Sequence, residues 1–276
     1  MRVHHLIAAG LLWTVGCGGT TVDKESIGVR PLADVPDYAW RELAGKRILF
    51  GHQSVGDNIM EGISDLIRAE PKIGLRVIGI EDASSAEESF LAHGKIGKNR
   101  FPGLKTDEFA RLLEGGLASQ VDIAFHKYCF ADIDEGTDVA AVFEHYKTVM
   151  ARLKSEYPRI IFVHVTTPLM LAQSGPKAVV KKILGRQPDH YADNMQRERF
   201  NDLMRREYGG REPLFDLAAA ESSRPDGGRE TISFGGMTSR TLLPSYTTDG
   251  GHLNEVGRKH VATELLVSLS DLVAQK

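Results

Sequence analysis

Residues 46–58 read KRILFGHQSVGDN, and they join two kinds of secondary structure within a short stretch. The first six residues form a compact, largely apolar run, which is typical of a β-strand covered on both faces. Apolar residues then recur at helical spacing, so that Ile59, Ile63 and Leu66 share one stripe. The stretch therefore predicts a strand followed directly by a helix, with Ser54 at the turn between them.

The same alternation continues along the chain. Four further runs of strand type occupy residues 75–80, 121–128, 159–167 and 214–218. Segments with helical spacing lie between them, and a last apolar stripe runs through residues 261–272. Five strand–helix units predict a three-layer α/β/α sandwich with right-handed crossovers, in which sites gather at the carboxyl ends of the strands.

The composition is ordinary for a folded domain. The 276 residues include 34 basic and 37 acidic side chains, and 42% are hydrophobic. This balance argues against wholesale disorder, and the net charge of −3 argues against a nucleic-acid partner. About 250 residues can bury one large core, so we expect a single domain over residues 41–276.

The first residues are typical of an export signal. A short basic start precedes an apolar run at 6–15 that is too short to span a membrane, and Cys17 follows it. This cysteine resembles the lipidated residue of a bacterial lipobox, although Thr14 stands where leucine is usual. Plain cleavage by a signal peptidase is the alternative. We expect a signal peptide over 1–16, a lipidated tether over 17–40, and a periplasmic or outer-membrane-anchored protein that meets the membrane only through this anchor.

Ser54 stands where the first predicted strand gives way to a helix. The free N–H groups and partial positive charge of a helix start would stabilise an oxyanion there. Serine is also a common N-cap residue, and the position taken alone favours that structural role.

A second candidate lies near the other end, where residues 249–254 read DGGHLN just before the last helix. A tight turn of this spacing can bring the Asp249 carboxylate onto the His252 imidazole and stabilise the imidazolium. A polar turn that caps the helix is the alternative. With Ser54, these residues form a nucleophile, an orienting acid and a base. An ordinary α/β-hydrolase is disfavoured, because its Gly-x-Ser-x-Gly turn would need glycine where His52 stands.

These blocks resemble the SGNH (GDSL-type) hydrolase superfamily, and more narrowly its bacterial members with a Gly-His-Gln-Ser-Val-Gly first block. The similarity covers about residues 46–274. In that superfamily the first block carries the serine and a late Asp-x-x-His carries the base, and Ser54, Asp249 and His252 match those positions. The resemblance implies a flavodoxin-like, five-stranded parallel sheet and a serine hydrolase without cofactor or metal.

The third block departs from the superfamily. It normally ends a strand with Gly-x-Asn-Asp, whose asparagine donates to the oxyanion, whereas residues 129–132 read CFAD and place Ala131 at that position. One lost donor typically costs about 10²–10³ in rate, so another group should replace it. The candidates are the N–H groups of Ser54 and Gly97, the side chain of Asn99 and, more weakly, that of Asn58, which we expect to face the tether or solvent.

Other polar residues leave alternatives open. Lys127, late in a strand expected to be buried, could bind a substrate anion at the mouth of the site or pair with Asp132 or Asp134. The histidines show no spacing typical of a metal site. A face shared by Asn194, Arg197, Asn201 and Arg205 predicts a solvated or ion-paired surface. Residues 170–190, with Lys177, Lys181, Lys182 and Arg186, form either a basic lid or a soluble insertion, and we favour the insertion.

We therefore expect an exported serine esterase that hydrolyses or transfers an O-acyl group. Its substrate would be a small-molecule or glycan ester, or a lipid of the cell envelope. The alternative is a catalytically silent lipoprotein of the same fold that binds a glycan or a protein, suggested by the missing asparagine. A fainter third option is a metal-dependent phosphoesterase.

Overall fold

The structure is a computed structural model that describes residues 30–274. Five strands form the central sheet: β1 (Arg47–His52), β2 (Val77–Gly79), β3 (Phe90–Lys95), β4 (Ile123–His126) and β5 (Ile161–Phe162). Their order across the sheet is β2-β3-β1-β4-β5, and all neighbouring strands are parallel. The predicted α/β class with a five-stranded parallel sheet is confirmed.

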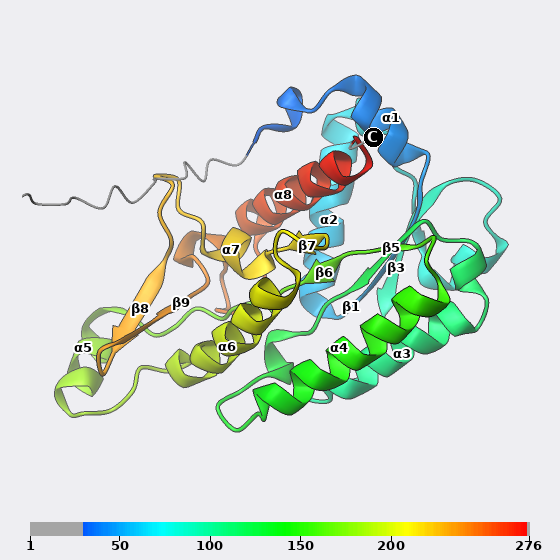
Figure 1. Ribbon diagram of the computed structural model, residues 1–276. Coiled ribbons are helices and arrows are strands. Elements are labelled where there is room, and N and C mark those ends of the chain that lie inside the picture. Colours follow the sequence, from blue (N-terminus) through cyan, green and yellow to red (C-terminus); the bar gives the residue numbers. More distant parts are fainter. Residues whose placement is uncertain (1–29, 275–276) are drawn as a thin grey trace, which may run out of the picture.

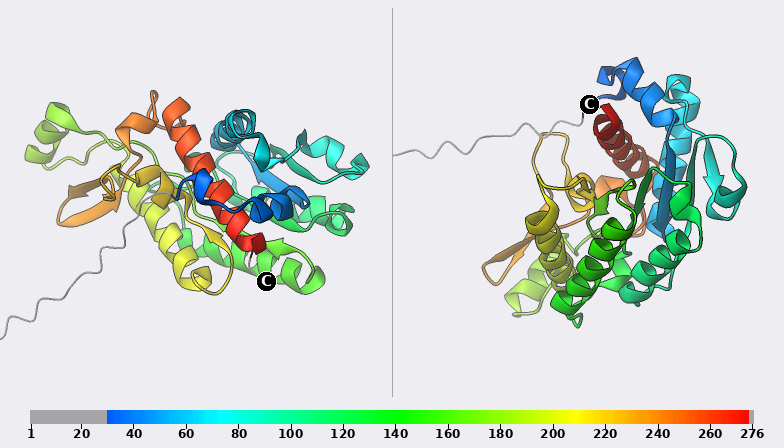
Figure 2. Two further views of the ribbon diagram at one scale, coloured as in Figure 1. Left: turned by 90° about the horizontal axis from the view of Figure 1, so that it is seen from above. Right: turned by 45° about the vertical axis from the view of Figure 1, so that its right-hand side comes forward.

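Helices cover both faces of this sheet (Figure 1). One face carries α1 (Asp37–Ala44), α2 (Ser54–Ala69), α7 (Leu217–Ser222) and α8 (Glu255–Ala274). The other face carries α3 (Pro102–Glu114), α4 (Val139–Glu156) and α6 (Tyr191–Tyr208). The views in Figure 2 show α8 and α1 lying side by side, as their close contact requires. The result is the three-layer sandwich.

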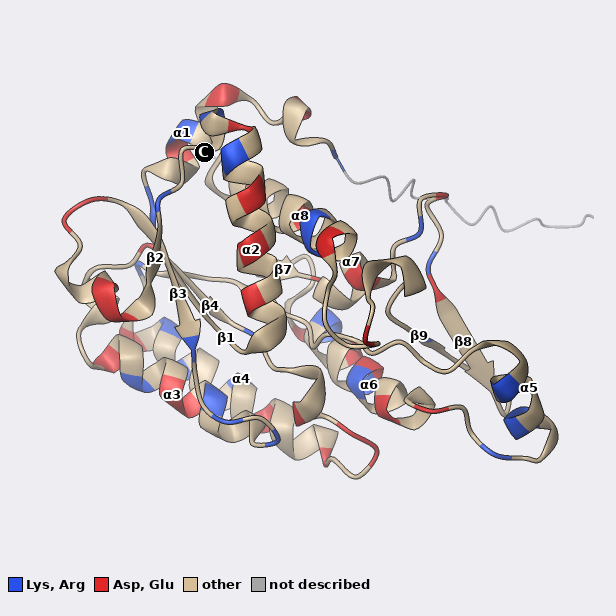
Figure 3. Ribbon diagram, turned by 180° about the vertical axis from the view of Figure 1, so that it is seen from behind, with Lys and Arg blue, Asp and Glu red and all other residues tan. Residues whose placement is uncertain are grey.

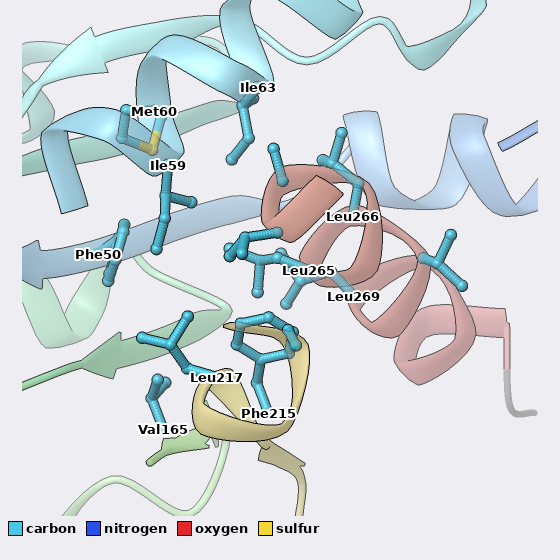
Figure 4. Close-up of a cluster of buried hydrophobic side chains, with 14 of the residues drawn as sticks. Phe50, Ile59, Met60, Ile63, Val165, Phe215, Leu217, Leu265, Leu266 and Leu269 are labelled. Carbon is cyan, nitrogen blue, oxygen red and sulfur yellow. The ribbon is translucent and has the colours of Figure 1, made fainter. Parts of the chain in front are cut away.

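Successive residues of β1 pack into two different hydrophobic cores, one on each face of the sheet. Ile48 and Phe50 of β1 point toward α2 and α8, whereas Leu49 between them packs on the side of α3 and α4. Figure 4 shows the first core, in which Phe50, Ile59 and Leu265 belong to one cluster. Because both faces of the strand are buried, residues 48–50 are all apolar instead of alternating with polar residues.

The strand prediction fails at two places. β3 pairs directly with the central β1, but no strand is predicted there, because its sequence FLAHGK dilutes an apolar run with histidine and glycine. The run at 214–218 forms only β7 (Leu214–Phe215), which pairs with β6 (His164–Val165) outside the main sheet. An antiparallel hairpin of β8 (Thr231–Phe234) and β9 (Met237–Arg240) also forms, and no strand is predicted there.

The folded part begins earlier than the predicted boundary at residue 41. α1 starts at Asp37, and Val35 and Trp40 are buried in the core that α8 completes. Pro36 precedes the helix with extended backbone and fixes its start. The tether predicted over 17–40 therefore has to end before Val35.

Two predictions fall on residues that the structure does not describe. The signal peptide over 1–16 and the lipidation of Cys17 both lie outside residues 30–274. Within residues 30–274, no helix has the length and apolar character to cross a membrane.

The close packing of α2 against α8 fixes the spacing between these two helices. A Cβ at Gly62 of α2 would lie 2.4 Å from the carbonyl oxygen of Arg258, so only glycine allows this approach. The Arg258 guanidinium then bonds Asp65 Oδ2 at 2.9 Å and Glu61 Oε2 at 2.7 Å. The two helices are thus held together where the middle of α2 meets the first turn of α8.

His126 in β4 gives the fold a testable pH dependence. The side chain is buried, its ring packs on Phe109 with centroids 4.8 Å apart, and neither ring nitrogen has a hydrogen-bond partner among the described residues. Burial lowers the pKa of His126 to about 3. The unfolded chain takes up this proton below about pH 6.5, so its uptake favours unfolding as the pH falls toward 3.

We expect His126→Phe to reduce the acid sensitivity of the free energy of unfolding. The difference should approach about 1.4 kcal/mol per pH unit between about pH 6 and pH 4, measured by chemical denaturation. Val256→Thr, at an exposed residue without a titratable group, is the control and should leave the slope unchanged. An unaltered slope in His126→Phe would show that this ring does not stay neutral in the fold.

Candidate active site

Ser54 is the first residue of α2, directly after the carboxyl end of β1. Gln53 before it is extended, with φ −136° and ψ −164°, so the chain turns from strand into helix at this point. The Ser54 side chain is half-buried. Its N–H group lies in the first helical turn, where such groups have no partner within the helix. The position supplies both a hydroxyl and a free backbone donor.

Asp249 and His252 lie on the loop that leads into α8. Asp249 Oδ1 accepts hydrogen bonds from the N–H groups of Gly251 at 2.9 Å and His252 at 2.8 Å. Asp249 Oδ2 lies 2.7 Å from His252 Nδ1. These bonds, first the two from the backbone, hold the pKa of Asp249 well below its usual range. The carboxylate therefore stays ionised and fixes the orientation of the imidazole.

A contact between His252 and Ser54 joins two segments that lie far apart in the sequence. His252 Nε2 lies 2.9 Å from Ser54 Oγ, although the residues are 198 positions apart in sequence. The structure thus brings together the three residues that the sequence singles out. The side chains of His252 and Asp249 are 42% and 55% exposed, so the relay formed by Ser54, His252 and Asp249 is open to solvent.

The loop with His252 is supported from three sides. Leu253 N–H donates to Asn58 Oδ1 at 3.2 Å, which ties the loop to α2. The Phe130 ring stands edge-on to the His252 ring at 5.5 Å, and Leu171 N–H donates to the carbonyl of Gly250 at 2.8 Å. The expectation that Asn58 faces solvent or the tether is wrong, because this side chain bonds the loop that carries His252.

Gly97 lies on the loop after β3, next to the residue that precedes Ser54. Gln53 Nε2 donates to the carbonyls of Ile96 at 2.7 Å and Gly97 at 3.3 Å. Gly97 has φ +59°, and a Cβ there would lie 2.8 Å from the backbone of Lys105, so glycine is required. The loop is therefore fixed close to the start of α2.

Among the described residues, neither Asn99 nor Lys127 makes a hydrogen bond to Ser54 or His252. Asn99 is exposed, and its Oδ1 accepts from Lys105 Nζ at 2.9 Å. Lys127 is 1% exposed, burial lowers the pKa of its ammonium group, and its Nζ donates to the carbonyl of Tyr128 at 3.2 Å. The structure does not bring Lys127 to the open surface beside the relay.

The third block forms a short helical turn, Phe130–Asp132, after β4. Phe130, next to the aligned Ala131, occupies the space beside His252. Asp132 is buried and accepts from Cys129 N–H at 2.6 Å, Arg100 N–H at 2.8 Å and Lys105 Nζ. One carboxylate therefore ties together the loops that flank β1 on both sides.

The Lys105–Asp132 pair was not predicted, because the sequence suggested Lys127 as the partner of Asp132. Lys105 is fully buried on the inner face of α3, four residues before the buried Phe109. A lysine in register with an apolar stripe is a signal that could have identified a buried ion pair.

The prediction of a solvated or ion-paired face on α6 holds for Arg205 and is wrong for the other three residues. Asn194, Arg197 and Asn201 are all buried, and only Arg205 keeps partial exposure with an ion pair to Asp216. Arg197 Nε donates to the carbonyl of Phe130 at 2.9 Å. The Asn194 amide accepts from Met170 N–H and donates to the carbonyl of the same residue, at 3.1 and 2.7 Å. These side chains hold the segments against which the catalytic loop packs.

The histidines near the site do not gather into a metal centre. His52 Nε2 and His93 Nδ1 are 2.9 Å apart, and burial lowers the pKa of His52 to about 3. His126 lies apart in the aromatic cluster. Over residues 30–274, no group of three or more histidine, cysteine or acidic side chains could hold a metal ion.

Comparison with solved structures gives distant likenesses. A protein from Streptococcus pneumonia, described provisionally as a platelet activating factor, is 15% identical, with 86% of this chain and 90% of that one covered and a TM-score of 0.47. A G-D-S-L family lipolytic protein assigned provisionally in Desulfitobacterium hafniense is 10% identical, covering 81% and 99%, with a TM-score of 0.45. The periplasmic domain of a Salmonella Paratyphi A lipopolysaccharide acetyltransferase is 11% identical, covering 85% and 96%, with a TM-score of 0.42. No protein-family model and no curated protein matches the sequence.

Lys105→Met should destabilise the protein strongly, because it leaves the Asp132 carboxylate buried without its cation. Breaking a buried pair from one side costs about 3–5 kcal/mol, measured by urea denaturation. Asp132→Asn added to Lys105→Met should recover part of that loss. Arg111→Ala, which breaks the exposed pair with Glu108, is the control and should stay within about 0.5 kcal/mol. If Lys105→Met and Arg111→Ala lowered the free energy of unfolding by similar amounts, the proposal that the Lys105–Asp132 pair holds the loops together would be contradicted.

Proposed function

We propose that this protein is a serine esterase of the SGNH type that cleaves or transfers an O-acyl group. One observation carries the proposal, namely the unbroken chain of contacts through the relay. Ser54 Oγ lies 2.9 Å from His252 Nε2, and His252 Nδ1 lies 2.7 Å from Asp249 Oδ2. This is the arrangement of nucleophile, base and orienting acid by which serine hydrolases act.

In the first half-reaction, Ser54 Oγ attacks the ester carbonyl while its proton passes to His252 Nε2. The tetrahedral intermediate then expels the alcohol, which leaves with the proton from His252. Asp249 stabilises the imidazolium without taking the proton, because the N–H groups of Gly251 and the histidine keep its carboxylate ionised. An acyl group remains on Ser54.

The oxyanion of each intermediate needs donors near Ser54 Oγ. The Ser54 N–H lies at the positive end of α2, and the Gly97 N–H is the second donor that we propose, since its loop is bound to Gln53. Asn99 stays a candidate if substrate binding draws it from Lys105. Phe130, beside His252, adds no side-chain donor.

In the second half-reaction, His252 takes a proton from water, and the hydroxide attacks the acyl carbonyl and frees Ser54. A sugar hydroxyl in place of water would give an O-acyltransferase. The open position of the relay supports a bulky ester, such as an acylated glycan or a lipid of the cell envelope. We propose further that residues 1–16 are an export signal and that Cys17 is lipidated, which would hold the enzyme at that envelope.

A second function is favoured by one specific observation. The third block lacks an asparagine donor and carries Phe130 against the catalytic histidine. A catalytically silent protein that binds a glycan or protein partner on the same fold would tolerate this change. Measuring turnover separates the two candidates.

Ser54→Ala should lower the turnover of short-chain p-nitrophenyl esters by at least about 10³-fold, because it removes the nucleophile. Ser64→Ala changes a half-buried serine of the same helix and is the matched control, with activity expected at the wild-type level. A fluorophosphonate should modify Ser54 and leave Ser64 unmodified, as located by mass spectrometry.

Absence of both turnover and labelling in the wild-type protein, while a known esterase reacts under the same conditions, would exclude the esterase and favour the binding protein. Turnover that survives in Ser54→Ala and stops with a chelator would favour the metal-dependent phosphoesterase instead.

A further inference from the structure

Exposed apolar side chains concentrate on one short helix, α5 (Gly175–Ile183), and the residue after it. Four of the ten large exposed hydrophobic residues within 30–274 lie here: Val179 at 54%, Val180 at 55%, Ile183 at 78% and Leu184 at 65% exposure. The last two are the most exposed of the ten. A contiguous patch of this kind marks an interaction site more often than scattered single residues do.

The helix is turned so that its apolar side faces away from the domain. Ala178 is its one buried residue. At 100° per residue, Val180 and Ile183 project on the side opposite to Ala178, whereas Val179 lines a small cavity toward β8. A surface helix of a globular protein normally buries its apolar stripe against the core. Here the domain leaves that stripe uncovered.

Positive charge surrounds the same patch. Residues 175–190 contain four cationic side chains, Lys177, Lys181, Lys182 and Arg186, and a single acid, Asp189, which pairs with Lys181 at 2.6 Å. Figure 3 shows the basic residues on α5, at the end of the molecule that also carries the β8–β9 hairpin. On the helical wheel, Lys177 lies about 60° from Val180 and Lys182 about 60° from Val179, so these two cations border the apolar side. Their stems can extend along that side while the ammonium groups reach outward.

We propose that α5 docks the protein onto an anionic lipid surface. The helix would lie in the plane of the membrane interface, with Ile183 and Leu184 among the upper acyl chains and Lys177 and Lys182 at the phosphates. An uncovered apolar side bordered by cations is the combination that interfacial helices use. The proposal does not rest on the esterase activity.

A membrane fits this patch better than a second copy of the chain. A stable protein interface buries about 800 Å² on each partner, more than the few side chains from Val179 to Leu184 can supply. Two copies meeting through α5 would also bring their lysines together, which costs energy. A bilayer with anionic headgroups accepts a small apolar insertion and neutralises the cations at once.

The position of α5 connects this surface with the relay. Leu171 N–H donates to the carbonyl of Gly250 in the catalytic loop at 2.8 Å, and Gln173 N–H donates to the carbonyl of Asp189 at 3.0 Å. The segment that carries α5 therefore leaves the domain beside the catalytic loop and returns to the same place. A cavity of about 220 Å³ separates α5 from β8 and Leu171, and Figure 1 shows α5 beside the β8–β9 hairpin. Docking through α5 would bring the edge with Ser54 close to the lipid surface.

The test measures binding of the full chain to sedimenting vesicles. Every protein carries Cys17→Ser, so that no lipid can be attached there. Vesicles of phosphatidylcholine with about 30% phosphatidylglycerol are compared with vesicles of phosphatidylcholine alone, and the wild-type α5 should bind the anionic vesicles more tightly. Ile183→Gln with Leu184→Gln should weaken that binding by at least about tenfold.

The charges are tested in the same assay. Lys182→Gln should weaken binding to the anionic vesicles about fivefold. Tyr38→Gln and Lys72→Gln remove an exposed ring and an exposed charge remote from α5 in sequence, and should leave binding unchanged. Ile183→Trp should show a blue shift of its fluorescence on anionic vesicles, which reports entry of this position into an apolar environment.

Three outcomes would overturn the proposal. The first is equal binding by the wild-type protein and Ile183→Gln/Leu184→Gln, and the second is equal binding to neutral and anionic vesicles. The third is a dimer in analytical ultracentrifugation that the double variant abolishes, since a second copy would then cover the patch. Ester turnover on soluble substrates should be the same in all variants, so loss of docking is separable from loss of activity.

Discussion

α2 and α8 touch backbone to backbone at Gly62, where a side chain would collide with the carbonyl of Arg258. Ser54 opens the first of these helices, and His252 stands just before the second. The spacing between the helices therefore sets the distance between hydroxyl and imidazole. A hydrogen bond of 2.9 Å tolerates little change in that spacing, and displacements of about 1 Å are enough to disable a catalytic pair. The chemistry of the site thus depends on a packing contact that contains no catalytic group.

Buried polar groups stabilise the surroundings of the relay. Asp132 joins the loops on either side of β1, and Arg197 holds the carbonyl of Phe130, whose ring packs against His252. Polar groups removed from water are costly unless they are paired, so these bonds favour one arrangement of the loops over others. The relay itself is half-exposed, but the segments beneath it are fixed by a network inside the domain.

The sequence was most informative where chemistry and local geometry coincide. The spacing of Asp249 and His252 predicts their contact, and the position of Ser54 after an apolar strand predicts a helix start. It was least informative where contacts with residues far apart in the sequence determine the structure. β3 is short and diluted by polar residues, and its place beside β1 comes from pairing that no local pattern reveals. The face of α6 that carries Arg197 consists of polar residues typical of a solvated surface. It is nevertheless buried, because its side chains form hydrogen bonds with backbone groups of remote segments.

Ser54 and His252 stand 198 residues apart, and this separation matters during protein synthesis. While the ribosome is still making the intervening segments, the serine hydroxyl has no base and its helix has no partner helix. Contacts between such distant segments form only after both have emerged, and they form late in folding. The contact between Ser54 and His252 therefore cannot form before nearly the whole domain has been synthesised.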